Sequence, residues 1–117
     1  MKLYLILFLI VVNVNSSLSE NLDLLILHNN DMHGRFEETS ARSGKCQPED
    51  KKLQNCVGGI ARVAHVIRQA RKAAQEGKGP QVLYLNGGDT YTGTPWFSVH
   101  KWKIVVEFLN LLEPNAV

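Results

Sequence analysis

Two short apolar segments separated by one long helical pattern constrain this chain most strongly. Residues 22–27 read LDLLIL and residues 81–86 read QVLYLN, and such lengths and compositions are typical of buried strands. Between them, residues 60–74 carry apolar side chains at the three-to-four-residue spacing of a helix. Two strands joined through a helix are normally parallel. The pattern therefore predicts an α/β fold built on a parallel strand pair, with residues 22–27 buried on both faces.

The rest of the chain adds less regular structure. A second helical pattern covers about residues 101–112, and residues 115–117 resemble the first step of a third strand. Residues 34–55 show no sustained period and predict a long loop. The 117 residues suffice for one small domain. Because two strands and an incipient third cover a sheet poorly, we expect a partial domain of low independent stability.

The first residues have the order of a secretory signal peptide. Lys2 precedes an unbroken apolar run from Leu3 to Val12, and small polar residues follow it. The run is shorter than the roughly 20 residues that span a bilayer. We therefore predict a signal peptide over residues 1–19, cleaved after Ser17 or Ser19, and a secreted mature chain over residues 20–117. A buried N-terminal strand and an uncleaved anchor are the alternatives.

The chain has two cysteines, Cys46 and Cys56. In the oxidising secretory pathway an even number of cysteines favours a disulfide. The alternative is a pair of zinc-binding thiols, which would require further Cys or His residues nearby at ligand spacing.

The net charge of the chain gives no support for a polyanionic partner. The formal net charge is only +2, which gives no electrostatic basis for binding nucleic acid or a membrane surface. The cations of residues 60–74 fall mainly off the apolar stripe and predict a solvated helix face, with a phosphate-attracting patch as the alternative: Arg62, Arg68, Arg71 and Lys72. The segment NGGDTYTGT is glycine-rich but lacks the lysine and spacing of a P-loop.

Metal-ligating side chains follow both predicted strands. Asp31 and His33 come after the first strand, and Asp89 comes after the second. Since ligands in open α/β sheets bind beyond the carboxyl ends of the strands, the topology brings these three residues to one edge. Carboxylate and imidazole together suit Zn, Mn or Fe, and Asp89 could bridge two ions. The alternative is a polar turn, in which Asp31 is a cap and His33 a loop residue.

Three segments in order resemble a known family. ILHNNDMHGRFEET, GGIARVAHVIRQAR and VLYLNGGDTYTGTPWF are similar to the N-terminal part of the secreted and cell-surface 5'-nucleotidases, including insect apyrase-like members. These enzymes are calcineurin-like metallophosphoesterases. The resemblance covers roughly residues 22–117 and implies part of a four-layer α/β/β/α metallophosphoesterase domain with a two-metal centre, with zinc preferred and manganese an alternative.

The resemblance also assigns roles to residues. Asp31 and His33 look like ligands of the first metal, Asp89 like the bridging carboxylate, and Cys46 and Cys56 like the early disulfide pair of the family. The family's next motif, G-N-H-[ED], supplies a further ligand and the catalytic histidine. We expect it beyond Val117, together with the C-terminal nucleotidase domain, so no catalytic residue is assigned in this chain.

The resulting prediction is a partial, secreted, metal-dependent 5'-nucleotidase or apyrase that acts on extracellular nucleotides through metal-activated water. We expect the 117 residues alone to be inactive. One alternative is a non-enzymatic isoform that binds nucleotide or a partner, and another is a sister activity on cyclic nucleotides or nucleotide sugars. An anchor signal would be C-terminal in such proteins, so no membrane attachment is assigned.

Overall fold

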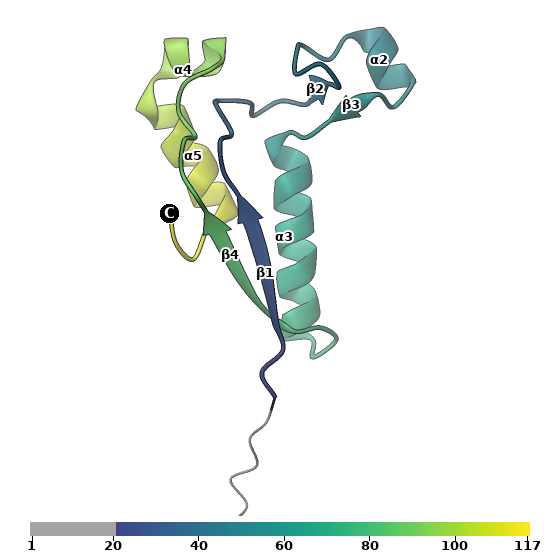
Figure 1. Cartoon of the computed structure of the whole chain (residues 1–117), viewed down its shortest axis with the longest axis vertical. Coiled ribbons are helices and arrows are strands. Elements are labelled where there is room, and N and C mark those ends of the chain that lie inside the picture. Colours follow the sequence, from purple (N-terminus) through teal and green to yellow (C-terminus); the bar gives the residue numbers. More distant parts are fainter. Residues whose placement is uncertain (1–20) are drawn as a thin grey trace, which may run out of the picture.

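A computed structural model describes residues 21–117 of the chain. The predicted signal peptide over residues 1–19 lies outside the described residues. The described part is a small α/β unit with mixed helices and strands, and its two long strands lie side by side (Figure 1). Within it, no helix is long and apolar enough to cross a membrane.

The central sheet pairs β1 (Leu24–Asn29) with β4 (Gln81–Asn86), and the two strands run parallel as predicted. Leu24 lies opposite Gln81 and Asn29 lies opposite Asn86, so both strands end at the same edge. The predicted third strand begins as a single parallel bridge between Leu85 and Ala116. The loops that follow β1 and β4 therefore begin side by side at this edge of the sheet.

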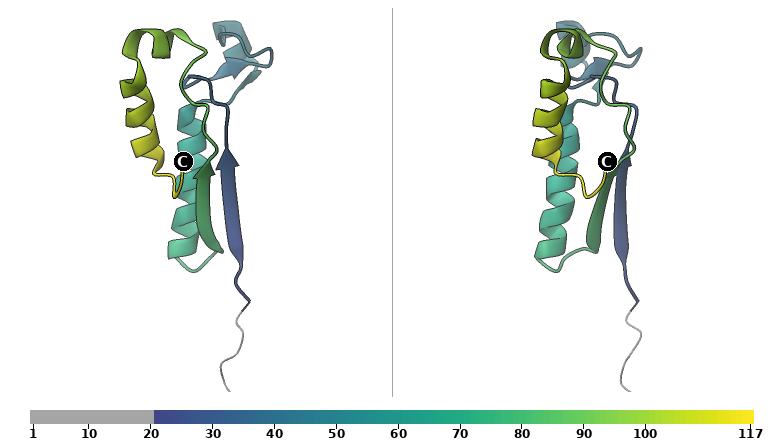
Figure 2. Two further views of the ribbon diagram at one scale, coloured as in Figure 1. Left: turned by 60° about the vertical axis from the view of Figure 1, so that its left-hand side comes forward. Right: turned by 90° about the vertical axis from the view of Figure 1, so that its left-hand side faces the viewer.

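Two helices cover one face of this sheet. Helices α3 (Ile60–Gln75) and α5 (Trp102–Leu112) lie on the same side of β1 and β4 (Figure 2). Ile67, Tyr84 and Leu112 form the centre of the buried cluster. The apolar stripe predicted for residues 60–74 therefore packs against the sheet and α5.

The prediction that the first strand is buried on both faces is wrong. Leu24, Leu25 and Ile26 are exposed, and Ile26 retains 57% of its accessible surface. Helices α3 and α5 cover the same face of the sheet, so the side chains that point to the other face contact solvent. The strand also begins two residues later than predicted, because Leu24 is the first residue with a partner on β4.

The segment predicted as a long loop contains three short elements. Strand β2 (Thr39–Ser40) pairs antiparallel with β3 (Cys56–Val57), and α2 (Pro48–Lys52) lies between them. The predicted disulfide joins Cys46 to Cys56, with their Cα atoms 5.8 Å apart. This segment projects from the N-terminal end of α3 (Figure 1). The disulfide closes residues 46–56 of it into a loop.

Glu38 ties this segment to α3. Its carboxylate accepts from Lys51 Nζ at 2.6 Å and from Arg62 Nη2 at 2.9 Å. The hydrogen bond from Lys51, together with the charges of Lys51 and Arg62, lowers the pKa of the Glu38 carboxyl. One carboxylate therefore bridges a helix inside the disulfide loop and a helix of the main unit.

The prediction that the cations of residues 60–74 form a solvated face is wrong for Arg71. Its Nη1 donates to the carbonyl oxygen of Leu112 at 3.1 Å, and its Nη2 donates to the carbonyl oxygen of Glu113. Arg71 therefore satisfies carbonyl groups at the C-terminal end of α5, where a positive charge is also favoured by the helix dipole. Helix α4 (Pro95–His100), which precedes α5, was not predicted.

Candidate metal centre

The loops that follow β1 and β4 are held together by backbone hydrogen bonds. The amide of Asp31 donates to the carbonyl of Gly88 at 3.0 Å, and the amide of His33 donates to that of Asp89 at 3.2 Å. The amide of Gly34 donates to Thr90 O at 2.8 Å. Three amides of the first loop thus continue the contacts of the parallel pair beyond the strands. The two loops form one layer above the sheet edge.

This layer brings the three predicted ligands together. His33 Nε2 lies 3.4 Å from Asp31 Oδ1 and 3.4 Å from Asp89 Oδ2. The ligand atoms of all three residues lie within 4.8 Å of one another. The prediction that topology places them at one edge is confirmed, while their role as metal ligands stays a prediction.

All three residues have left-handed backbone. The φ angles are +52° at Asp31, +49° at His33 and +47° at Asp89. A residue with a Cβ atom rarely adopts this region, and each such residue costs on the order of 1–3 kcal/mol. Backbone of this kind persists only where surrounding contacts impose it, and it is concentrated at functional sites. A positive φ also occurs outside the cluster, at Ser43, Gln54, Lys101 and Glu113, so the cluster is distinguished by its converging donor atoms rather than by its backbone.

The donor set fits a divalent ion. Two carboxylates and one imidazole are borderline ligands that suit zinc or manganese. Two ligand atoms that each lie about 2.1 Å from a tetrahedral ion are about 3.4 Å apart, which is the separation of His33 Nε2 from both carboxylates. Both distances from His33 therefore match the separation of two ligand atoms on one ion, and the third pair lies within 4.8 Å.

The cluster is open to solvent. The side chains of Asp31 and Asp89 are 56% and 58% exposed, and that of His33 is 36% exposed. The side-chain amide of Asn30 donates to Asp31 Oδ2 and orients the carboxylate. Sequence reasoning missed Asn30. The available signal was its place in the N-D-x-H pattern, immediately before a candidate ligand.

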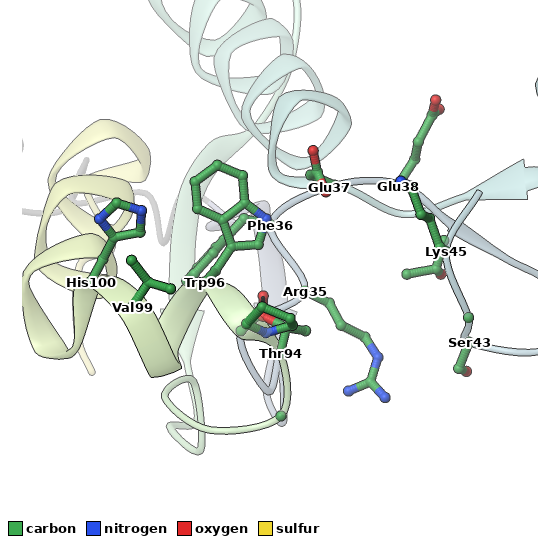
Figure 3. A pocket seen from close by; sticks show the side chains of 15 residues that line it. Arg35, Phe36, Glu37, Glu38, Ser43, Lys45, Thr94, Trp96, Val99 and His100 are labelled. Atoms are coloured by element: carbon green, nitrogen blue, oxygen red, sulfur yellow. Dashed lines mark hydrogen bonds between the residues drawn. The ribbon is translucent and has the colours of Figure 1, made fainter. Parts of the chain in front are cut away.

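A hollow of about 470 Å³ adjoins the cluster without containing it. Its walls come from residues 34–39 and 43–45 of the first long connection and from residues 93–96 and 99–100 around α4. Figure 3 shows Trp96 and His100 on one wall, with Thr94 and Arg35 below them. The hollow meets the candidate ligands at Gly34 and Gly93, the nearest lining residues in the chain to His33 and Asp89.

Comparisons with known proteins find sequences similar to this chain among 5'-nucleotidases and apyrases. No family model matches it. It is 50% identical to Protein 5NUC of Lutzomyia longipalpis over 94 residues, which are 80% of this chain and 16% of that protein. It is 46% identical to Snake venom 5'-nucleotidase of Naja atra, over 81% of this chain and 16% of the relative. It is 38% identical to Apyrase of Aedes aegypti, over 89% of this chain and 17% of the relative. The chain thus spans less than a fifth of the length of each of these curated relatives.

Proposed function

We propose that this chain, which belongs to the family of 5'-nucleotidases and apyrases, contributes part of a metal centre that hydrolyses phosphate esters of extracellular nucleotides. The observation that carries the proposal is the Asp31–His33–Asp89 cluster, whose donor atoms converge at the edge of the sheet. The names of the relatives give the substrate class, and the cluster gives the chemistry that such a substrate needs.

In this proposal each residue has one task. Asp31 and His33 would hold the first of two divalent ions, and Asp89 would be the carboxylate that the second ion shares. When bound, such ions supply Lewis-acid activation of water and offset charge on the phosphoryl oxygens. Asn30 keeps the Asp31 carboxylate oriented through its side-chain amide. Zinc is the preferred ion, and manganese is the alternative that the same donor set accepts.

The fold and the location belong to the same proposal. We infer that the sheet and its two helices form part of a four-layer α/β/β/α domain, to which residues 20–117 contribute. The bare apolar face formed partly by Leu24 and Ile26 supports this, because a further layer would bury it. Secretion through the predicted signal peptide agrees with the disulfide, since disulfides persist in oxidising compartments.

Metal binding by the 117-residue chain is the direct test. Calorimetric titration with Zn²⁺ or Mn²⁺ should show saturable binding, and Asp89→Asn should weaken it by at least about tenfold because a carboxylate ligand is lost. Asp23→Asn makes the same chemical change at an exposed position before β1 and should leave the affinity unchanged. Equal affinity in Asp89→Asn and the unmodified chain would show that the cluster is not the metal site.

Turnover is tested separately. A two-metal centre needs more ligands than the three side chains of this cluster, so we expect negligible release of phosphate from AMP by the 117-residue chain. Measurable AMP hydrolysis that disappears with a chelator and in Asp89→Asn would contradict this expectation. Saturable AMP binding without hydrolysis would instead favour a non-enzymatic nucleotide-binding role.

A further inference from the structure

Gly93 and Thr94, which follow Asp89 in the second loop, contact the backbone at His33 and Gly34. Gly93 and Thr94 come from the loop between β4 and α4, and they meet the chain at His33 and Gly34, about 60 residues earlier. The sequence pattern GDTYTGT contains both residues but assigns them no task. Their contacts suggest one.

Gly93 lies against His33 so closely that no side chain fits. A Cβ atom at position 93 would lie 2.4 Å from the carbonyl oxygen of His33 and 2.8 Å from its Cβ. The φ angle of Gly93 is +124°, which also disfavours any other residue. The absent side chain lets the second loop lie directly on the backbone of the candidate ligand.

The side chain of Thr94 bonds to another loop instead of capping its own helix. It is the N-cap residue of α4, a position where a threonine oxygen commonly accepts from the first turn of the helix. Here the side chain makes no such bond, and its hydroxyl donates to the carbonyl oxygen of Gly34 at 2.6 Å. Gly34 is buried, so this bond satisfies a carbonyl that solvent does not reach freely.

These contacts act on a strained residue. His33 has a left-handed φ of +49°, and the residue after it is held at both ends: the Gly34 amide donates to Thr90 O, and the Gly34 carbonyl accepts from the Thr94 hydroxyl. Gly93 packs on His33 itself. Strained backbone of this kind persists where several contacts determine it together.

We propose that Gly93 and Thr94 are positioning residues that hold His33 in its left-handed conformation and so keep the imidazole between Asp31 and Asp89. The proposal rests on the proposed metal-binding function for its consequence, because a misplaced imidazole would weaken coordination. Its structural part stands on the contacts of the metal-free chain. Both residues act through His33 and supply no ligand atom to the cluster themselves.

Thr94→Val removes the hydroxyl and keeps the shape of the side chain. We expect Zn²⁺ affinity, measured by calorimetry, to fall about tenfold, in the range seen when an outer-shell partner of a metal ligand is lost. Thr94→Ser keeps the hydroxyl and should restore the affinity. Thr92→Val makes the same substitution at an exposed position two residues earlier and should leave it unchanged. Equal affinity in Thr94→Val and the unmodified chain would overturn the proposal.

Amide hydrogen exchange of the metal-free chain gives a second readout. In Thr94→Val the amide of Gly34 should exchange about tenfold faster or more, whereas amides within β4 should keep their rates, because the change is confined to the loop layer. Exchange that is unchanged at Gly34, or accelerated equally in β4, would contradict a local positioning role. This measurement decides the proposal even if the unmodified chain binds no metal, which would refute the proposed function alone.

Gly93→Ala tests the close approach. The added Cβ must displace the His33 backbone, so we expect a larger loss of Zn²⁺ affinity than in Thr94→Val. An affinity equal to that of the unmodified chain would show that the loops can separate without consequence for His33. If Gly93→Ala does not fold, as judged by loss of a cooperative melt, the Thr94 variants and the exchange measurement still decide.

Discussion

Removing the hydroxyl of Tyr84 tests how the core is connected to the edge of the sheet that carries the metal cluster. Tyr84 is 1% exposed and packs with Ile67 and Leu112 between the sheet and the helices. Its hydroxyl donates to Asn29 Oδ1 at 2.6 Å, and Asn29 is the last residue of β1. Tyr84→Phe keeps the ring in place and deletes only this bond.

The expected cost follows from what the substitution leaves behind. Within residues 21–117, the side-chain nitrogen of Asn29 is already buried without a hydrogen-bond partner. Losing the Tyr84 hydroxyl would leave the Asn29 oxygen unpartnered as well. A buried acceptor deprived of its partner costs about 1–3 kcal/mol, because its desolvation is no longer offset. We therefore expect the free energy of unfolding to fall by about 1–3 kcal/mol.

Urea denaturation followed by circular dichroism measures this difference, and Tyr91→Phe is the matched control. Tyr91 is 45% exposed and its ring packs edge-on against Phe97, so deleting a solvated hydroxyl there should change the free energy of unfolding by less than about 0.5 kcal/mol. If the two substitutions shift the free energy of unfolding by the same small amount, the Tyr84–Asn29 bond contributes nothing and the reasoning is refuted.

The same experiment has a pH dependence of known sign. Burial raises the pKa of the Tyr84 phenol above its ordinary value of 10.0, although the charge of Arg71 opposes the shift. The unfolded chain releases this proton first, so its contribution to stability is present below about pH 10 and is lost as the pH rises through the higher pKa of the folded state. The difference between the unmodified chain and Tyr84→Phe should therefore shrink in strongly alkaline solution.

Two further predictions concern the disulfide loop. Replacing Cys46 and Cys56 together by alanine opens a loop with a sequence separation of 10. The loss of this constraint on the unfolded chain should lower the free energy of unfolding by about 2.7 kcal/mol. A loss below about 1 kcal/mol in urea denaturation would contradict this. Glu38→Gln should destabilise the chain at neutral pH by weakening the bonds to Lys51 and Arg62, and the difference should disappear as the pH falls from 4.5 through the lowered pKa of Glu38. A difference between the urea midpoints that stays constant over this range would show that the Glu38 charge does not contribute.

The elements that sequence predicted well are those whose signal is local. Strand β4 and helix α3 were predicted nearly to the residue, because apolar spacing and the following glycine or polar residues define them within the segment itself. Strand β1 was placed two residues early, because its apolar run extends to Leu22 while its partner strand begins opposite Leu24. The extent of a strand depends on its neighbour, and that information lies elsewhere in the chain.

The site divides in the same way. Parallel topology alone predicted that Asp31, His33 and Asp89 would meet, and they do. The left-handed backbone at all three residues and the bond from Thr94 to Gly34 were not predictable from local pattern. They arise from contacts between residues about 60 positions apart, which no periodicity encodes. The exposure of β1 was missed for a related reason, because burial depends on which layers pack against a strand.

The backbone, more than the side chains, sets the geometry of this cluster. The carboxylates and the imidazole are largely exposed, so their positions derive from the loop path beneath them, which amide-to-carbonyl bonds and the close approach of Gly93 determine. It follows that chemistry and geometry can be altered independently. Asp89→Asn changes a donor atom and leaves the loop path intact, whereas Thr94→Val leaves every donor atom intact and loosens the path. If the backbone positions the ligands, both variants should lower the metal affinity. Only Thr94→Val should accelerate hydrogen exchange at the Gly34 amide.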